Sequence, residues 1–175
     1  MRAIDELDGA GLRAEADALA EVLRDCVLNG ASVGFVLPFP HEEARAFWLG
    51  LVPSLERGER RLFVMRDSSG VVCGTVQLVL SGMPNGAHRA EISKMLVHSR
   101  ARRQGIAQAL MLHAESHARE LGRTLLVLDT CTGYEAEKMY ARLGFKLCGT
   151  IPNYAAMPDG SLGSTSVMYK PLAPA

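Results

Sequence analysis

The segment that most constrains the fold is a strand-like run that leads through a basic loop to a glycine and then into a helical pattern. It reads Val97-His-Ser-Arg-Ala-Arg-Arg-Gln-Gly-Ile-Ala-Gln-Ala-Leu110. The first backbone N–H groups of a helix have no partners within the helix, and the helix dipole adds partial positive charge at the same end. Because phosphate oxygens satisfy both, this strand-to-helix turn predicts a phosphate-binding site.

The residue types of the turn agree with an anionic ligand. Gly105 allows close approach of the backbone to a ligand, and Ala107 leaves the first helical turn uncrowded. Charged donors are supplied by Arg100, Arg102 and Arg103. The loop lacks both the Gly-Lys-Ser/Thr of a Walker A loop and the Gly-x-Gly-x-x-Gly of a dinucleotide turn. Phosphate is therefore indicated, whereas a nucleoside triphosphate or NAD is not. The alternative is a solvated basic loop before an ordinary helix.

The elements predicted around this turn describe a layered α/β domain with a mixed sheet. Apolar residues at helical spacing predict helices over residues 12–28, 41–55, 105–121 and 134–143. Strands are predicted over residues 62–65, 71–80, 90–97, 124–129, 145–148 and 166–170. The run 124–129 is apolar up to Asp129, which is typical of a strand covered on both faces. The chain has 175 residues with no internal repeat or dividing linker, so we expect a single domain over residues 1–175.

Composition and charge narrow the classes of partner. Lys and Arg together number 19, as do Asp and Glu, so the basic excess of a sequence-independent nucleic-acid binder is missing. The four cysteines form no CxxC pair, which favours reduced thiols in the cytoplasm. No apolar run is long enough for a membrane span, and His113 and His117 lack a third ligand for a metal. We therefore expect a cytoplasmic protein with no nucleic-acid, membrane or metal partner.

Two motifs resemble a known family. Arg102, Gly105 and Ala107 match Gln/Arg-x-x-Gly-x-Gly/Ala, the acetyl-CoA signature of the GNAT superfamily of N-acetyltransferases. The later Tyr140-Ala-Arg-Leu-Gly-Phe145 resembles the Tyr-x-x-x-Gly-Phe element of the same family. Two motifs in the right order, each on the right predicted element, are more specific than either alone. The resemblance implies a largely antiparallel mixed sheet, splayed at its centre and flanked by helices, with acetyl-CoA as cosubstrate and no metal.

The resemblance also implies which residues would hold acetyl-CoA. The pantetheine arm would enter between the strand before the loop and the next parallel strand, beside the backbone groups of Met95, Leu96 and Val97. The diphosphate would lie over the turn formed by Arg102, Arg103, Gln104, Gly105, Ile106 and Ala107. Gly133 departs from the family, in which a polar residue is common at that position. Further stretches, among them residues 30–35 and 158–160, extend the resemblance to members that confer resistance to antibiotics.

Three side chains are candidates for the chemistry of acetyl transfer to an amine. Tyr140 is the candidate acid, because a phenol with a pKa of about 10 can protonate a leaving thiolate whose pKa is about 8.5. The alternative is a tyrosine that only packs its helix on the sheet. Asp129 ends an apolar strand and Glu91 lies on the strand before the loop, so either could orient the amine or relay its proton through water. The alternative for both is a salt bridge with a basic neighbour: Arg89, Lys94 or Arg123.

These residues lead to several hypotheses of function. The first is transfer of acetyl from acetyl-CoA to the primary amine of a small molecule, such as an amino-acid-like toxin or antibiotic, by direct attack in a ternary complex. The others are protein or peptide N-acetylation and a non-catalytic CoA-binding regulatory domain. An acyl-enzyme on Cys131 would need a base partner that the sequence does not identify. Phe47 and Trp48 are interpreted as helix packing, and the resemblance implies a possible homodimer.

Overall fold

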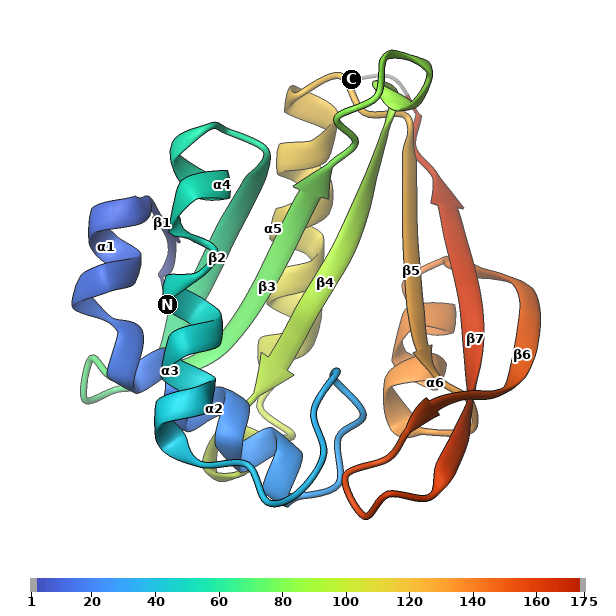
Figure 1. Cartoon of the computed structure of the whole chain (residues 1–175). Helices are drawn as coiled ribbons and strands as arrows, with labels where there is room; N and C mark the ends of the chain where they lie inside the picture. The colour runs from blue at the N-terminus through green and yellow to red at the C-terminus, as the bar shows by residue number, and fades with distance from the viewer. Residues whose placement is uncertain (1–2, 174–175) are drawn as a thin grey trace.

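The computed structural model describes residues 3–173 and shows one seven-stranded sheet with helices on both faces (Figure 1). The elements are, in chain order, β1 (Ile4–Leu7), α1 (Gly9–Ala14), α2 (Ala16–Leu28), α3 (His41–Leu49), α4 (Val52–Glu56), β2 (Arg60–Arg66), β3 (Val72–Leu80), η1 (Pro84–Gly86), β4 (Arg89–Val97), η2 (Ser99–Ala101), α5 (Ile106–Glu120), β5 (Leu125–Cys131), α6 (Glu135–Arg142), β6 (Lys146–Ala156) and β7 (Leu162–Pro171).

The sheet has the order β1-β2-β3-β4-β5-β7-β6 and opens at its centre. Every neighbouring pair is antiparallel except β4 and β5, which run parallel. That parallel pairing extends only from Arg89 opposite Leu125 to Glu91 opposite Val127, after which the two strands diverge (Figure 1). The predicted fold, a largely antiparallel sheet splayed at its centre, is therefore confirmed. We call the space between the diverging halves of β4 and β5 the opening.

Alternating side chains divide the buried residues between two cores, one on each face of the sheet. Phe63 of β2 packs towards α5 and α6, whereas its neighbours Leu62 and Val64 pack towards α1–α4, where Trp48 is fully buried. α5 lies close to the sheet because β3 has Gly74 beneath it. A Cβ atom on Gly74 would lie only 2.8 Å from Cγ2 of Ile106. The position of α5, and with it the turn that precedes it, thus depends on a glycine in the middle of a strand.

Several elements differ from those predicted. The helix predicted over residues 12–28 is divided at Glu15, and the one over 41–55 ends at Leu49 and resumes as α4. β1 was not predicted, and β6 is much longer than residues 145–148 because nearly every residue along it is exposed and leaves no apolar pattern. β5 is buried on one face only, whereas the apolar run 124–129 predicted a strand covered on both faces.

Within the described residues, no helix is long and apolar enough to cross a membrane.

Candidate active site

A bulge in β4 sets which side chains face which layer beyond the parallel pairing. Thr75 of β3 pairs with Leu96 and Gln77 pairs with Ser93, so two residues of β4 lie opposite the single residue between them. Lys94, one of those two, has φ 47°, a value rarely adopted by a residue with a side chain. The Thr75 hydroxyl donates a hydrogen bond of 2.8 Å to the Lys94 carbonyl oxygen, which holds this conformation. The bulge therefore redirects the side chains of β4 at the opening.

The backbone groups that face the opening follow from the alternation of an antiparallel ladder. The N–H of His98 donates to the Cys73 carbonyl of β3, so the polar groups of Val97 turn away from β3. The Val97 carbonyl instead accepts hydrogen bonds from Arg102 Nε at 3.3 Å and from the Cys26 thiol at 3.5 Å. By the same alternation the backbone of Leu96 faces β3, and its side chain is buried against α1–α4. Of the three candidates on β4, Met95 and Val97 are those whose backbone faces the opening.

The turn into α5 has the properties of an anion site. Gly105 is the residue before the helix and has φ 76°, and Arg103 is also left-handed at φ 61°. No side chain caps the helix and its first turn contains no acidic residue, so its first N–H groups remain available. A Cβ atom added at Gly105 would have nothing within 4 Å, which leaves the approach to these groups open. The residues from Arg102 to Ala107 therefore fit the diphosphate of a coenzyme.

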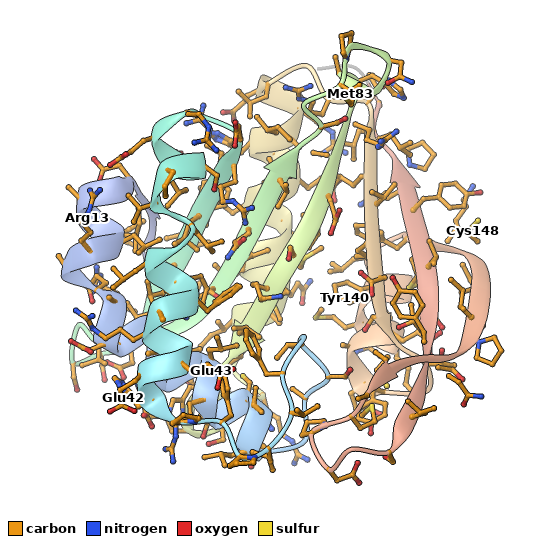
Figure 2. The ribbon with its side chains drawn as sticks, viewed as in Figure 1. Arg13, Glu42, Glu43, Met83, Tyr140 and Cys148 are labelled. Carbon is orange, nitrogen blue, oxygen red and sulfur yellow. The ribbon has the colours of Figure 1, made fainter. Side chains whose placement is uncertain are left out.

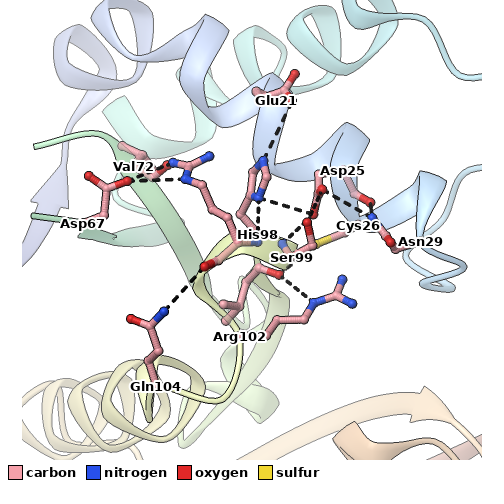
Figure 3. Close-up of polar contacts among 12 residues, drawn as sticks. Glu21, Asp25, Cys26, Asn29, Asp67, Val72, His98, Ser99, Arg102 and Gln104 are labelled. Carbon is pink, nitrogen blue, oxygen red and sulfur yellow. Dashed lines mark hydrogen bonds and ion pairs between the residues drawn. The ribbon is translucent and has the colours of Figure 1, made fainter. Parts of the chain in front are cut away.

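Side chains from two other elements fix the loop before this turn (Figure 3). Asp25 of α2 accepts hydrogen bonds of 2.7 Å from both the backbone N–H and the hydroxyl of Ser99. Arg100 forms an ion pair of 3.2 Å with Asp67 and also donates to the Val72 carbonyl. Arg100 was expected to offer a donor to phosphate, and the structure instead directs it to the β2–β3 turn.

The two candidate carboxylates share one face of the sheet. Ile92 of β4 and Leu128 of β5 are buried on the α5/α6 side, so their neighbours Glu91 and Asp129 point to the opposite side of the sheet. Although Glu91 is exposed overall, partial desolvation of its carboxyl and the negative charge of Asp129 raise its pKa. Across residues 3–173 neither carboxylate takes part in an ion pair, so the predicted alternative of a salt bridge is not observed.

Tyr140 comes to the opening from α6, next to β5 (Figure 2). Its side chain is 6% exposed, and its ring lies 5.9 Å from that of Phe145. Burial, and secondarily the charge of Asp129, raise the pKa of its phenol above the ordinary value. Glu137 fixes the start of α6, because it accepts hydrogen bonds of 2.6 Å from the Gly133 N–H and from the Ser166 hydroxyl. Gly133, which lacks the polar side chain common in the family, thus contributes its backbone N–H to this contact.

A bridge crosses between the two halves of the molecule at the end of the opening. The chain from residue 30 to 40, between α2 and α3, meets the β6–β7 turn, where the Leu37 N–H donates to the Pro158 carbonyl at 2.9 Å (Figure 1). Phe47 of α3 also faces this region. Its ring lies 5.2 Å from that of Phe35 and 5.3 Å from Nζ of Lys94. The sequence interpretation of Phe47 as simple packing missed this contact, and Lys94 was considered only as a salt-bridge partner.

Other candidate residues have structural roles. His113 and His117 pack edge-on against Phe63 at 4.8 and 5.1 Å between ring centroids. Among the described residues no three His, Cys, Asp or Glu side chains form a metal-binding group. The Cys131 thiol donates to Met157 Sδ at 3.8 Å, and burial together with the charge of Glu137 raises its pKa. A raised pKa lowers the thiolate fraction and disfavours Cys131 as a nucleophile.

Solved structures of acetyltransferases share this fold. A GCN5-related N-acetyltransferase from Kribbella flavida is 26% identical, with 98% of both chains covered and a TM-score of 0.77. A phosphinothricin acetyltransferase from Sinorhizobium meliloti, solved with acetyl-CoA, is 22% identical, with 98% of this chain and 89% of that chain covered and a TM-score of 0.79. A ribosomal-protein-alanine N-acetyltransferase from Brucella melitensis is 22% identical, with 97% and 99% covered and a TM-score of 0.74.

A family model supplies the assignment that fold alone does not. The model of the acetyltransferase (GNAT) family matches residues 19–145, which is well over half of the chain and includes the loop, the α5 turn, both carboxylates and Tyr140. The match and the geometry of the α5 turn agree with the resemblance carried by the two sequence motifs. The chain belongs to the GNAT family and is an acetyl-CoA-dependent N-acetyltransferase.

Proposed function

We propose that this enzyme acetylates the primary amine of a small molecule by direct attack on acetyl-CoA in a ternary complex. The observation that carries the proposal is that Asp129 lies within electrostatic reach of both Glu91 and Tyr140 at the opening, next to the free N-terminus of α5. Acetyl-CoA supplies the thioester. The first N–H groups of α5 would hold its diphosphate, and the backbone of Met95 and Val97 would bind its arm and polarise the carbonyl.

The side chains at the opening divide the proton transfers between them. Glu91, whose pKa is raised above that of an ordinary glutamate, would take a proton from the acceptor's ammonium, directly or through water, so that the neutral amine can attack the thioester carbonyl. Asp129 would hold the ammonium in place. Tyr140 would donate its proton to the leaving thiolate, which also becomes more basic in a desolvated site.

The bridge between residue 37 and residue 158 favours a small acceptor over a folded protein. It closes one end of the opening on the side where Glu91 and Asp129 point, so it limits the length of chain that can lie there. The stretches on either side of this bridge, residues 30–35 and 158–160, are similar to the tabtoxin-resistance acetyltransferase. Together with the phosphinothricin acetyltransferase among the structural neighbours, this similarity supports an acceptor that resembles an amino acid, such as a toxin or antibiotic.

Initial-velocity kinetics over a panel of amines tests the proposal. Release of free thiol from acetyl-CoA is measured with small primary amines in one arm and with unstructured peptides in the other. Direct transfer gives intersecting lines in double-reciprocal plots, whereas an acyl-enzyme gives parallel lines. Turnover of peptides alone would favour the protein-acetylating alternative, and binding of acetyl-CoA without turnover in either arm would favour the regulatory one.

A further inference from the structure

Lys94 is a cation directed into the acceptor side of the opening. Within residues 3–173 it forms no ion pair, and its Nζ instead lies 5.3 Å from the centre of the Phe47 ring. It also approaches the segment between α2 and α3 closely, since a Cβ atom added to Gly34 would lie 3.9 Å from Nζ. The ammonium is therefore enclosed between β4, α3 and the segment that forms the bridge.

The bulge is the reason that Lys94 points there. In an unbroken strand, Lys94 would share a face with Ala90 and Ile92, whose side chains are buried against α5. The left-handed conformation of Lys94 turns its side chain to the face that carries Glu91 and Asp129. A strained backbone at a lysine is maintained only where the surrounding structure supports it, as the Thr75 hydrogen bond does here.

The charges around Lys94 form a dipolar site. Burial lowers the pKa of Lys94, while the charges of Asp129 and Glu91 raise it in part, so both carboxylates lie within electrostatic reach. A simple amine that placed its ammonium at the carboxylates would be repelled by Lys94, because like charges at a binding site disfavour a ligand. A ligand with a negative group beside its ammonium would pair with both signs, and would give the partly buried Lys94 the direct ion pair that it lacks within residues 3–173.

We infer that Lys94 binds an anionic group of the acceptor and thereby makes the enzyme selective for amines with a neighbouring carboxylate or similar anion. The inference rests on the proposed function, because it assumes that a small amine occupies the opening. The substrate class it names is the zwitterionic amino acid and its analogues, and it argues against polyamines and other polycations. Lys94 is then a specificity residue that touches the acceptor and takes no part in the proton transfers.

Matched acids and amides provide the test. L-amino acids and the corresponding L-amino acid amides keep the same amine and side chain and differ in the negative charge. With acetyl-CoA saturating, wild type is expected to prefer the acids in kcat/KM. Lys94→Met should lower kcat/KM for the acids by about 10–100-fold, the loss expected for a charged hydrogen bond, mainly through KM. The same variant should change the amides by no more than about threefold, and Lys94→Arg should keep the preference for acids.

Arg89→Met is the control for charge alone. Arg89 is exposed at the start of β4, where the strand is still paired with β5, so this change removes one positive charge outside the opening. Arg89→Met should leave the ratio of kcat/KM for acids to kcat/KM for amides unchanged.

Equal losses of kcat/KM for acids and amides in Lys94→Met would overturn the inference and indicate that Lys94 only balances the charges of the two carboxylates. A wild type without preference for acids overturns it as well, whether or not Lys94→Met folds. If wild type acetylates no small amine, the proposed function itself fails.

Discussion

At the scale of single residues, the environment of Tyr140 defines what its hydroxyl can do. Burial and the nearby negative charge of Asp129 both disfavour the phenolate and raise the pKa of Tyr140, so its environment favours the protonated hydroxyl. A protonated hydroxyl suits Tyr140 to the role of proton donor rather than that of base.

Removal of the Tyr140 hydroxyl should impair chemistry more than binding. Tyr140→Phe keeps the ring that packs on Phe145, so stability and acetyl-CoA affinity should change little. Loss of a general acid should lower kcat by roughly 10²–10⁴-fold. Tyr154→Phe, which removes an exposed hydroxyl on β6, serves as the control. Full kcat in Tyr140→Phe, under conditions where chemistry limits the rate, would show that water or the substrate protonates the thiolate.

The coupling of the two carboxylates predicts the direction of a pH shift. The negative charge of Asp129 raises the pKa of Glu91, so Asp129→Asn should lower that pKa. If the base must be ionised, the acid limb of kcat/KM for the acceptor should move to lower pH in Asp129→Asn, and acceptor KM should rise. Glu91→Gln should lower kcat and remove that limb. Using one acceptor for all variants cancels the titration of its own amine. An acid limb that stays in place in Asp129→Asn would contradict the assignment of Glu91 as base.

At the scale of elements, the N-terminus of α5 combines three features that no single residue supplies. Gly74 lets the helix lie close on β3, the left-handed Gly105 turns the chain into the helix, and Asp25 holds the preceding loop through Ser99. The N–H groups of the first turn are thereby fixed in direction before any ligand binds. Fixed donors lose less conformational entropy on binding than mobile ones do.

A negative charge at this turn should weaken coenzyme binding. Gly105→Glu would place a carboxylate at the N–H groups and repel phosphate, so acetyl-CoA affinity should fall by at least about tenfold by calorimetry, consistent with repulsion of two unit charges at a surface site. Gly122→Glu is a matched control at the other end of the same helix, because Gly122 also has positive φ, 71° against 76°, and open space around it. Both variants carry the same backbone strain. Equal affinities in the two variants would refute diphosphate binding at residues 102–107.

At the scale of the whole molecule, the sheet ends in an edge strand whose residues are nearly all exposed. β6 pairs with β7 on one side only, and its apolar Leu147, Ile151 and Tyr154 are all more than 40% exposed. Exposed apolar edge strands promote association unless something covers them. This exposure supports the expectation of a homodimer.

Sedimentation equilibrium can test whether two copies associate through β6. We expect a dimer at micromolar concentration, and Ile151→Lys should shift the equilibrium to monomer because it places a charge in an apolar contact. Leu162→Lys, on β7 and also exposed, is the comparison for a charge added outside β6. A monomeric wild type at micromolar concentration would contradict the expectation.

The sequence by itself determined the features that depend on local chemistry. A basic loop, a glycine and a helical pattern specified the turn that we propose binds phosphate, because helix N-termini and left-handed glycines act through their own backbone. Apolar periodicity located most strands and the α5 and α6 helices. It did not locate β1 or most of β6, since short or exposed edge strands carry little apolar pattern.

Only the tertiary structure decided which residues meet at the opening. The parallel pairing of β4 and β5 ends at Glu91, which brings Glu91 near Asp129, about 40 positions later in the chain, and α6 brings Tyr140 within electrostatic reach of Asp129. The bulge at Lys94 reverses the side-chain alternation that the sequence predicts, and the ion pair with Asp67 removes Arg100 from the phosphate turn. These outcomes depend on contacts between distant segments, which the local pattern of residues does not encode.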